Sequence, residues 1–591
     1  MKERKDESEV MNLTTFECDV LIVGGGAAAA RAAIEAADNG AFVILVDKGI
    51  FGFSGASGIH AGWVVASSFL RLNGDNMNAH FMDTLRGGGW IANQKLVRIM
   101  CNEACARILE LETYGNMFTR GFDGKPKAFA LGGHSRKRSF TPAYMWIMAN
   151  EVRRRGVRIL EEVIITNLVN YEGQIVGATG INIKTGEFYV FRAKSTVLAT
   201  GGAGQLYGFS TVSAITTNPQ ESTGDGYAMA YRAGCELVDM EFQQFLLGLL
   251  YPPVLMGSFP AIYPAMKDCV CDKDKNFWMK ELPLTKVTRA RLINETLNKI
   301  EKGKGSPHGG VWADFSGAED FYKEFPNTLE TYCIKHVLPK FRMDYKRQMF
   351  EVAPSLHHFM GGVVINEKCE TTIPGLYACG EVTGGIHGGN RLGSNAFIDC
   401  LVFGKRAGEF AAKRALNKIE RPKMDWKQVE NEYERIYDIL KRTPEKPIKV
   451  HEIRRKIQKI IFSKAGPRRV GKDMEDAVRE LEKIRVKELP RMYVRSKTTT
   501  YNIEWVEGLA TYNMIDTAEM ILRSSLTRTE SREAHQRRDY PETDNENWLM
   551  NIYIKKAGDT MNIFTRPIVA TEVTPEMIKE MMQNHISHAE G

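Results

Sequence analysis

Residues 17–48 read ECDVLIVGGGAAAARAAIEAADNGAFVILVDK, and this stretch decides the fold. An apolar run precedes three glycines, an alanine-rich segment follows them, and a second apolar run ends at Asp47. This order predicts a strand, a glycine turn, a helix and a second strand, which together make a βαβ unit. In the pattern G-x-G-x-x-G the three positions are Gly24, Gly26 and Ala29. The sequence therefore predicts an α/β fold that begins with a dinucleotide-binding unit.

The residues of this unit suit a bound dinucleotide. Gly24 permits the tight turn, and Gly26 lets the backbone approach a pyrophosphate at the helix N-terminus. Asp47 ends the second strand, where an acidic side chain accepts a hydrogen bond from a ribose hydroxyl. A glycine pattern alone is a weak signal, but here the strand, the helix and the acid accompany it. Dinucleotide binding is thus favoured over the alternative, a plain buried turn.

Composition argues against several other classes of protein. The chain has 591 residues, of which 43% are hydrophobic, enough to bury the cores of several domains. Its net charge of +7 comes from 79 basic and 72 acidic residues that are dispersed along the chain, so no nucleic-acid partner is expected. The first residues are charged, without the apolar segment of a signal peptide, and no long apolar run follows. We expect a cytoplasmic protein with no direct membrane span, for which partner subunits are the route to any association with a membrane.

The ten cysteines do not form a cluster motif. They are scattered, without C-x-x-C pairs or a four-cysteine run. We expect reduced thiols, no bound metal and no iron–sulfur cluster in this chain. The nearest pairs, Cys101 with Cys105 and Cys269 with Cys271, leave a metal site as the less favoured alternative.

Two further glycine-rich segments lie downstream. STVLATGGAG, residues 195–204, predicts a short strand that ends at Thr200, Gly201 and Gly202. Residues 373–415 predict an apolar strand that ends at Gly380 and Glu381, then a glycine-rich loop and an alanine-rich helix. Such a loop brings backbone N–H groups against a flavin, and a helix N-terminus favours negative charge on its ring.

Together these segments resemble the flavoprotein subunit of the succinate dehydrogenase/fumarate reductase family, which includes L-aspartate oxidase and adenylylsulfate reductase α subunits. The matching pieces occur in family order and span nearly the whole chain. They are VGGGAAAA (23–30), GGHS (132–135), LATGGAG (198–204), STGDGYAMAYRAG (222–234), MEFQQF (240–245), HHFMGGVVIN (357–366), GEVTGGIHGGNRLGSNAFIDCLVFG (380–404) and RTESREAHQRRDYPETDNENWL (528–549).

The resemblance implies a split, Rossmann-like FAD-binding domain with an inserted α+β capping domain and a C-terminal helical domain. The expected divisions are residues 1–244 and 356–420 for the FAD-binding domain, 245–355 for the cap, 421–545 for the helical domain and 546–591 for an extension. Residues 421–490 are rich in Lys, Glu, Arg and Leu and poor in Gly, which independently indicates solvated helices.

The resemblance implies FAD as the cofactor, and FGFSGASGIHAG (51–62) indicates how it is held. Quinone-linked members carry a Ser-His-Thr run here whose His bonds covalently to FAD, whereas Gly55 takes that position and His60 lies further on. We therefore expect noncovalent FAD, with small residues passing close to the flavin ring. The residues expected at the cofactor are Gly24, Gly26, Ala29, Asp47, Lys48, Ser54, Gly55, Ala56, Ser57, Gly58, Thr200, Gly201, Gly202, Asp225, Gly380, Glu381, Arg391, Ser394 and Asn395.

The family's substrate site is only partly matched. His357 and Arg391 stand at the positions of a substrate His and a substrate Arg, and both can hold an oxyanion. Leu246 replaces the other substrate His, which predicts a pocket that holds a single anionic group firmly. Lys286 takes the position of the family's proton-delivering Arg, and Arg289 and Arg291 lie near it in the sequence. The alternative interpretation is that Lys286 is an ordinary surface lysine. His358 is interpreted as a packing neighbour.

The predicted activity is hydride exchange between FAD and a small anionic substrate, with electrons passed to an iron–sulfur partner subunit. Without the covalent link the flavin has a lower reduction potential. This favours reduction of the substrate over its oxidation, or a different substrate. The alternatives are an adenylylsulfate-reductase-like or aspartate-oxidase-like enzyme, or an electron-transfer flavoprotein with an altered site inside a larger complex.

Overall fold

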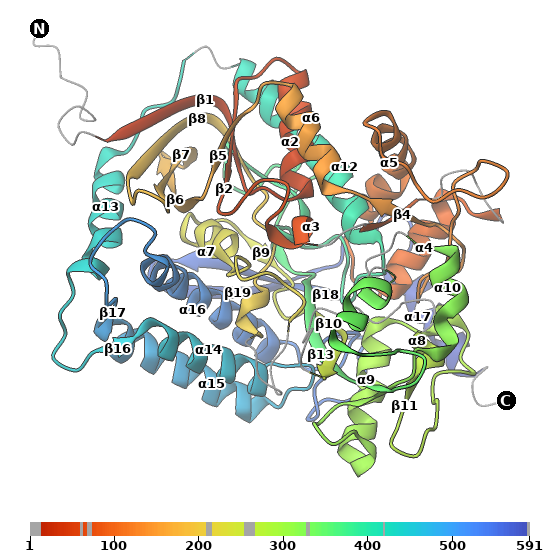
Figure 1. Cartoon of the computed structure of the whole chain (residues 1–591). Helices are drawn as coiled ribbons and strands as arrows, with labels where there is room; N and C mark the ends of the chain where they lie inside the picture. The colour runs from red at the N-terminus through yellow and green to blue at the C-terminus, as the bar shows by residue number, and fades with distance from the viewer. Residues whose placement is uncertain are drawn as a thin grey trace, which may run out of the picture.

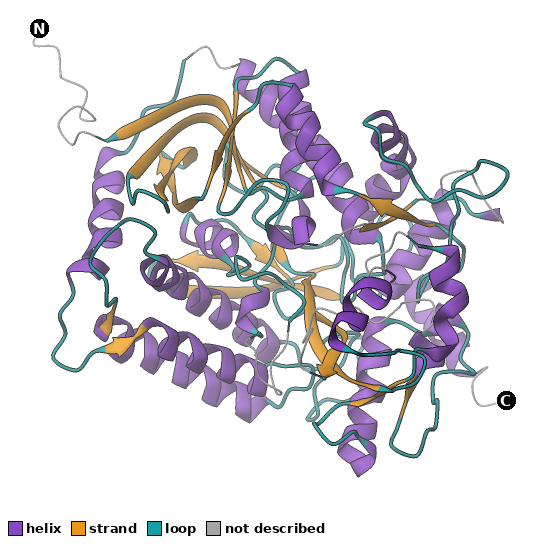
Figure 2. Cartoon of the chain, viewed as in Figure 1, coloured by secondary structure: helices purple, strands orange, loops and turns teal. Residues whose placement is uncertain are grey.

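The computed structural model describes residues 13–59, 63–67, 74–208, 216–252, 266–326, 331, 333–417 and 420–587. Helices and strands are interleaved through most of this length (Figure 2). His60 lies outside the described residues.

A seven-stranded sheet forms the FAD-binding domain, in the order β5-β2-β1-β8-β7-β6, with β15 also paired to β8 (Figure 1). Strands β1, β2, β5, β8 and β15 pair in parallel, whereas β6 and β7 form an antiparallel meander. Val23 and Ala378 both pair with Leu198, so the carboxyl ends of three parallel strands meet at one edge. Ligands of such sheets bind outside this edge. The strands are β1 (Thr14–Val23), β2 (Val43–Asp47), β5 (Arg158–Glu161), β6 (Val163–Tyr171), β7 (Gln174–Asn182), β8 (Phe188–Leu198) and β15 (Leu376–Ala378).

Two small-residue helices cover the sheet together. α2 (Ala27–Asp38) follows the glycine turn, and α12 (Asn395–Asn417) packs along it. A Cβ atom on Gly404 would lie 2.7 Å from the carbonyl oxygen of Ala28, and one on Gly408 would lie 2.2 Å from that of Ala32. Glycine at these two positions of α12 therefore lets the backbones approach closely. The helix that follows the last glycine-rich segment thus packs directly on the first βαβ unit, and the two parts of the split domain form one structure.

The inserted cap is an antiparallel sheet with helices, as expected. Its order is β10-β13-β12-β11, and α9 (Arg289–Lys299) packs on β10. The expected boundaries 245 and 355 fall inside β10 and β13, so this sheet extends a few residues beyond each. The strands are β10 (Gln243–Tyr251), β11 (Val270–Cys271), β12 (Val311–Ala313) and β13 (Phe350–Phe359).

Long helices form the next part of the chain, and the C-terminal segment returns to the FAD-binding domain. The strand pair β18 (Met550–Ala557) and β19 (Thr560–Pro567) joins β9 (Leu237–Val238) and β14 (Gly362–Val363) in one sheet. The expected extension is thus joined by a sheet to earlier parts of the chain. The helices are α13 (Trp426–Lys441), α14 (Val450–Lys464), α15 (Gly471–Lys483), α16 (Ile503–Thr527) and α17 (Pro575–Ser587).

A buried ionic network ties the motif RTESREAH to the start of the cap. Arg528 forms ion pairs with Glu241 at 2.7 Å and with Glu530 at 2.9 Å, and all three side chains are fully buried. Arg469, between α14 and α15, donates to the backbone oxygen of Glu241 at 2.6 Å and contacts His535 Nδ1 at 2.7 Å. Removing one partner of such a network leaves a buried charge unpaired, so these contacts fix the helical domain against the segment that leads into the cap.

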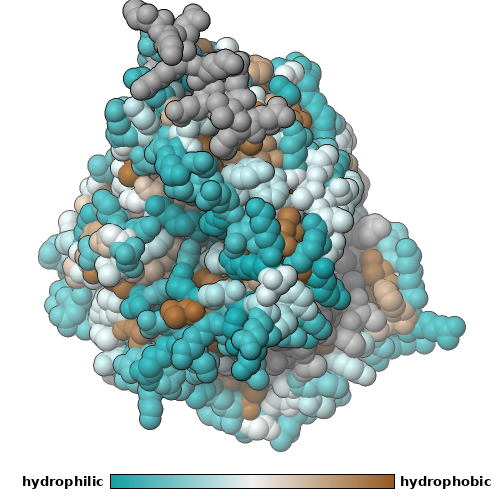
Figure 3. Space-filling model, turned by 90° about the vertical axis from the view of Figure 1, so that its left-hand side faces the viewer, coloured by the Kyte–Doolittle hydropathy of each residue, from teal (hydrophilic) through white to brown (hydrophobic). Residues whose placement is uncertain are grey.

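The remaining elements and the surface add little to the site. No helix in the described ranges is long and apolar enough to cross a membrane. The face in Figure 3 is mostly hydrophilic, with hydrophobic residues scattered over it. The other elements include α3 (Gly55–Ile59), β3 (Trp63–Ala66), α4 (Met77–Gly87), α5 (Gln94–Thr113), β4 (Ser139–Ala143), α6 (Met145–Arg154), α7 (Asp225–Arg232), α8 (Met266–Cys269), α10 (Glu319–Glu324), β16 (Ile448–Lys449) and β17 (Met492–Tyr493).

Candidate active site

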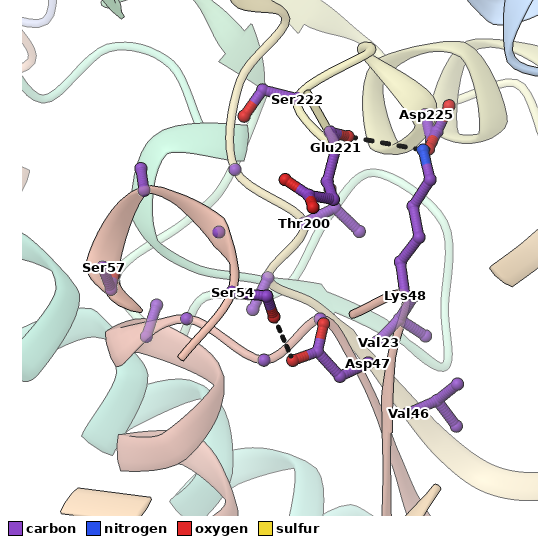
Figure 4. A pocket seen from close by; sticks show the side chains of 18 of the residues that line it. Val23, Val46, Asp47, Lys48, Ser54, Ser57, Thr200, Glu221, Ser222 and Asp225 are labelled. Carbon is purple, nitrogen blue, oxygen red and sulfur yellow. Dashed lines mark hydrogen bonds and ion pairs between the residues drawn. The ribbon is translucent and has the colours of Figure 1, made fainter. Parts of the chain in front are cut away.

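A cavity of about 970 Å³, its open mouth included, lies at the carboxyl ends of β1, β2 and β8. Its wall combines the glycine turn, the loop after β2, the end of β8 and the segment before α7 (Figure 4). Of the expected cofactor residues, twelve line it: Gly24, Gly26, Asp47, Lys48, Ser54, Gly55, Ala56, Ser57, Thr200, Gly201, Asp225 and Glu381.

The glycine turn is shaped for a close backbone approach. Gly24 has φ +118°, and a Cβ atom there would lie 2.2 Å from the carbonyl oxygen of Ala199 on the neighbouring strand. A Cβ atom on Gly25 would lie 2.0 Å from Asp47 Oδ2. Gly26 caps α2 without any side-chain hydrogen bond, and the N–H of Ala27 donates to Ser57 Oγ at 3.1 Å. The start of α2 therefore faces the cavity, where its dipole favours a pyrophosphate.

Asp47 and Lys48 stand side by side at the end of β2 and have different partners. Ser54 Oγ–H donates to Asp47 Oδ2 at 3.1 Å and the N–H of Gly49 donates to Oδ1 at 3.1 Å, while burial raises the pKa of Asp47. Lys48 forms an ion pair with Asp225 at 3.0 Å (Figure 4). Burial acts to raise the pKa of Asp225, but Lys48 and hydrogen bonds outweigh it and the pKa is lowered. Asp47, which lines the cavity, is thus held by neutral hydrogen-bond donors, whereas Lys48 is paired with an acid.

The small-residue loop leaves open space beside the cavity. Gly55 has φ +69°, and no described atom lies within 4 Å of where its Cβ would be. Gly55, Ala56 and Ser57 line the cavity, whereas Gly58 packs against Phe53, since a Cβ atom on Gly58 would lie 2.4 Å from the Phe53 carbonyl carbon. Because Gly55 has no side chain, it offers no atom for a covalent bond to a flavin.

Six expected cofactor residues are not among those that line this first cavity, in addition to Gly58. Ala29 is fully buried in α2, where it serves helix–sheet packing. Ser394 Oγ lies 2.8 Å from Ser139 Oγ, and Asn395 Oδ1 lies 2.9 Å from His80 Nε2, so both fix the start of α12. Gly202 and Gly380 pack against Glu381 and Ala28, and Arg391 lines a second cavity.

This second cavity, of about 490 Å³, adjoins the first, because Ala56, Ser57, Glu381 and Cys400 line both. Its other lining residues are Thr217, Asn218, His357, His358, Arg391, Ala396 and Phe397. The structure therefore brings His357 and Arg391 together at one polar pocket beside the cofactor cavity.

A β-bulge explains how His357 reaches this pocket. Gln244 of β10 pairs with His358 and Phe245 pairs with Leu356, so His357 is the extra residue of β13. A bulge re-aims side chains, and here two consecutive histidines line one cavity. His357 Nδ1 lies 2.8 Å from Thr217 Oγ1, and Asn218 Nδ2 donates to the His357 carbonyl at 3.0 Å. The position of His357 is thus fixed from two directions.

Lys286, the residue expected to deliver a proton, lies apart from both cavities. It is exposed, whereas Arg289 is 9% exposed and begins α9, and neither residue lines either cavity. Arg289 Nη1 donates to Gln244 Oε1 at 2.6 Å, and Gln244 Nε2 donates to the carbonyl of Arg391 at 2.7 Å. The structure therefore connects Arg289, rather than Lys286, to Arg391.

Sequence reasoning missed several lining residues. Thr217 and Asn218 lie a few residues before the recognised segment 222–234, and Cys400 lies within the segment 380–404, but no role was assigned to any of the three. Leu246 is 1% exposed, pairs with Ser355 and lines neither cavity, so its side chain does not form the pocket wall. Among the described residues no group of three or more His, Cys, Asp or Glu could hold a metal ion.

Comparisons with known proteins agree with this geometry. A family model described as FAD binding domain matches residues 19–397, and one described as Fumarate reductase flavoprotein C-term matches residues 454–581. The chain is 35% identical over 556 residues to a fumarate reductase (CoM/CoB) subunit of Methanothermobacter marburgensis, covering 92% of this chain and 98% of that one. It is 30% identical over 596 residues to the "Fumarate reductase flavoprotein subunit" of Mycobacterium tuberculosis, covering 95% and 99%.

A solved structure of the Mycobacterium smegmatis Sdh1 complex matches with a TM-score of 0.82 at 29% identity, covering 96% of each chain. The glycine cradle, the helix N-terminus and the acid at the end of β2 fit FAD, and the matched domain binds it. The chain therefore belongs to the succinate dehydrogenase/fumarate reductase flavoprotein family and is an FAD-dependent oxidoreductase.

Proposed function

We propose that this protein is the flavoprotein subunit of a reductase that acts on a small carboxylate and exchanges electrons with an iron–sulfur partner subunit. The observation that carries the proposal is the pocket shared by His357 and Arg391, which adjoins the FAD cavity through Ala56, Ser57, Glu381 and Cys400. Two relatives that are named as fumarate reductase subunits support a carboxylate substrate.

The chain's own residues would orient the substrate. FAD, when bound, supplies two-electron hydride chemistry. Arg391 is 3% exposed, so its guanidinium holds a carboxylate away from bulk water, where a bidentate contact is strong. His357, anchored by Thr217, adds a second directed contact. Arg289, linked through Gln244 to Arg391, is better placed than Lys286 to deliver a proton.

FAD is held without a covalent bond in this proposal. Gly55 stands where quinone-linked relatives carry the attaching His, and it has no side chain to bond with. The lower flavin potential that follows favours reduction of the substrate over its oxidation by a quinone.

The test is reoxidation of the reduced protein by a panel of small acids that includes fumarate and other enoates. Arg391→Ala should slow the best reaction by about a hundredfold, about 3 kcal/mol of transition-state stabilisation, because a buried anion loses its partner. Arg391→Lys should also be impaired, since a point charge cannot replace bidentate geometry. Equal rates in the wild type and both variants would overturn the proposed site.

The same panel separates the alternatives. Adenylylsulfate and L-aspartate are included, and turnover of either in place of the enoates would select the corresponding relative. A protein whose flavin cycles with an electron donor but reacts with none of these compounds would be an electron-transfer subunit.

A further inference from the structure

Arg468, between α14 and α15, reaches across to the C-terminal half of the cap helix α9. Its Nη2 atom donates to Asn298 Oδ1 at 2.5 Å and to the carbonyl oxygen of Asn294 at 3.2 Å. Its Nη1 atom donates at 2.5 Å to Glu301 Oε2, just beyond the end of α9, and Arg538 Nη2 donates to the other oxygen of Glu301 at 2.6 Å. These five residues form a set of contacts that we call the α9 clasp.

The two arginines of the α9 clasp stand on a fixed base. Arg469, which follows Arg468, is 1% exposed and donates to Gln243 Oε1 at 2.7 Å, in addition to its contacts in the buried ionic network. The N–H of Arg538 donates to the carbonyl oxygen of Arg469 at 2.9 Å, which places the two arginines of the clasp side by side. A planar guanidinium on a fixed backbone loses little freedom when it binds, so it holds its partner at a defined position.

A third cavity makes these polar contacts necessary. It has a volume of about 240 Å³, its opening included, and lies between one side of α9 and segments outside the cap. From α9 it is lined by Ala290, Ile293 and Asn294, and from the other segments by Asn390, Pro467 and Glu533. Atoms that border a void have no packing partner there. On this side α9 is therefore held at its two ends, by the contact of Arg289 with Gln244 and by the α9 clasp.

We propose that Arg468 is a positioning residue that holds α9 so that Arg289 stays at Gln244. Arg289 is the first residue of α9, and a helix released at its far end can tilt and carry Arg289 away from this partner. The inference rests on the proposed function, in which Arg289 delivers the proton, and deepens it by naming what sets the position of that group. Arg391 lies outside the cap, before α12, so its hold on the substrate does not depend on the clasp.

Hydrogen exchange of the oxidised holoprotein, followed by mass spectrometry, tests the clasp itself. Arg468→Ala should speed the exchange of the α9 amides by about 10-fold, the effect of one lost charge-assisted hydrogen bond, and should leave α2 unchanged. Arg468→Lys retains the charge without the planar fork and should lie in between. Arg479→Ala is the matched control, because it removes an exposed arginine of α15 that pairs with Asp476 in the same helix, and α9 should exchange as in the wild type.

Turnover of the best acid of the panel tests the consequence for Arg289. In Arg468→Ala, kcat per bound flavin should fall by about 10-fold, while KM should change by less than about 2-fold because Arg391 still holds the substrate. Slower proton delivery should also increase the solvent deuterium isotope effect on kcat. Arg468→Lys should recover part of kcat, and Arg479→Ala should match the wild type. Destabilisation of the fold alone would lower the flavin content without changing kcat per bound flavin.

The outcomes separate this inference from the proposed function. If the wild type reduces no acid of the panel, the proposed function fails, and the exchange of α9 alone then decides whether Arg468 holds the helix. Unchanged α9 exchange in Arg468→Ala would refute the inference. Faster exchange with an unchanged kcat would show that the clasp does not position Arg289, and a raised KM with an unchanged kcat would assign the effect to substrate binding. Each of these two results would also overturn the inference.

Discussion

Two glycines of the same turn, Gly24 and Gly26, differ in the space around them. A side chain on Gly24 would collide with the backbone of Ala199, whereas a Cβ atom on Gly26 meets only Ser57, with Oγ nearest at 3.3 Å. The two glycines of one motif therefore have different tasks. We expect Gly24 to be needed to build the turn and Gly26 to be needed to leave room for the cofactor.

The cofactor prediction follows from this difference. The purified protein should be yellow, and urea should release its FAD, because Gly55 forms no covalent link. Gly26→Val should fold but contain little FAD, since a branched side chain blocks the pyrophosphate. Flavin absorbance before denaturation measures the FAD content, and absorbance after denaturation and ultrafiltration measures the release of FAD. Flavin that stays attached to the denatured chain, or normal flavin content in Gly26→Val, would contradict the prediction.

Glu533 has an unfavourable backbone conformation next to the NRLGSN loop. Its φ is +46°, a region that costs a non-glycine residue about 1 kcal/mol or more, and burial raises its pKa to about 7 from 4.5. The N–H of Ala534 donates to the carbonyl of Gly389 at 3.2 Å, so the loop position is fixed. A carboxyl group whose pKa is raised on folding binds its proton more tightly in the native state, so stability falls as pH rises through this window.

Glu533→Gly should therefore raise the melting temperature, and it should do so more above pH 7 than below pH 4.5. Glu172→Gly is the matched control, because Glu172 is exposed and has φ +52°, and its variant measures the backbone effect alone. Melting temperatures of the wild type and both variants, measured below pH 4.5 and above pH 7, provide the comparison. A melting temperature for Glu533→Gly that is lower than that of the wild type above pH 7 would show that the carboxyl group stabilises the loop.

At the scale of elements, the contact of α12 with α2 joins two parts of the chain that are far apart in sequence. Gly404 and Gly408 occur one helical turn apart on α12 and face Ala28 and Ala32 of α2. The same α12 begins at the substrate pocket, where Ala396, Phe397 and Cys400 form part of the wall. The packing of these helices therefore positions the pocket as well as the core.

Gly408→Ala tests this coupling. Its Cβ would lie 2.2 Å from the carbonyl oxygen of Ala32, so α12 must move and stability should fall by roughly 1–3 kcal/mol. FAD content should fall with it. Gly317→Ala is the control, because a Cβ atom there meets no described atom within 4 Å, and it should change stability by less than about 0.5 kcal/mol. Chemical denaturation followed by flavin and tryptophan fluorescence measures both effects. A Gly408→Ala protein as stable as Gly317→Ala would contradict the proposed packing.

At the scale of the whole molecule, the chain binds FAD, and its described part shows no metal centre that could carry single electrons. Nine of the cysteines are in described positions without a disulfide, and no described group of three or more His, Cys, Asp or Glu could hold a metal ion. Two-electron flavin chemistry that feeds one-electron carriers needs a separate cluster. We therefore predict that the native protein occurs in a complex with an iron–sulfur subunit.

Affinity purification of the tagged chain from its native cells, with mass identification and iron analysis of bound proteins, tests this prediction. An iron–sulfur protein should co-purify in stoichiometric amount. The isolated chain should accept electrons from artificial donors but react slowly with oxygen or NAD. Rapid direct turnover of the isolated chain with either would count against a partner.

The sequence by itself determined the fold class and the cofactor, and twelve of the residues expected at the cofactor line the first cavity. Strand and helix periods, glycine turns and the acid at the end of β2 are short-range features, and residues 17–48 carry enough of them to define the unit. His357 and Arg391 were predicted from the motifs around them and do line one pocket.

Only the tertiary structure decided which neighbours complete that pocket. The bulge in β13 turns both His357 and His358 toward it, and a bulge depends on pairing with β10, which is more than a hundred residues away in the chain. The register of β10 keeps the side chain of Leu246 out of the pocket wall, and the start of α9 puts Arg289 instead of Lys286 next to Gln244. Long-range register and packing set these positions, because local sequence fixes the type of an element but not what lies across from it.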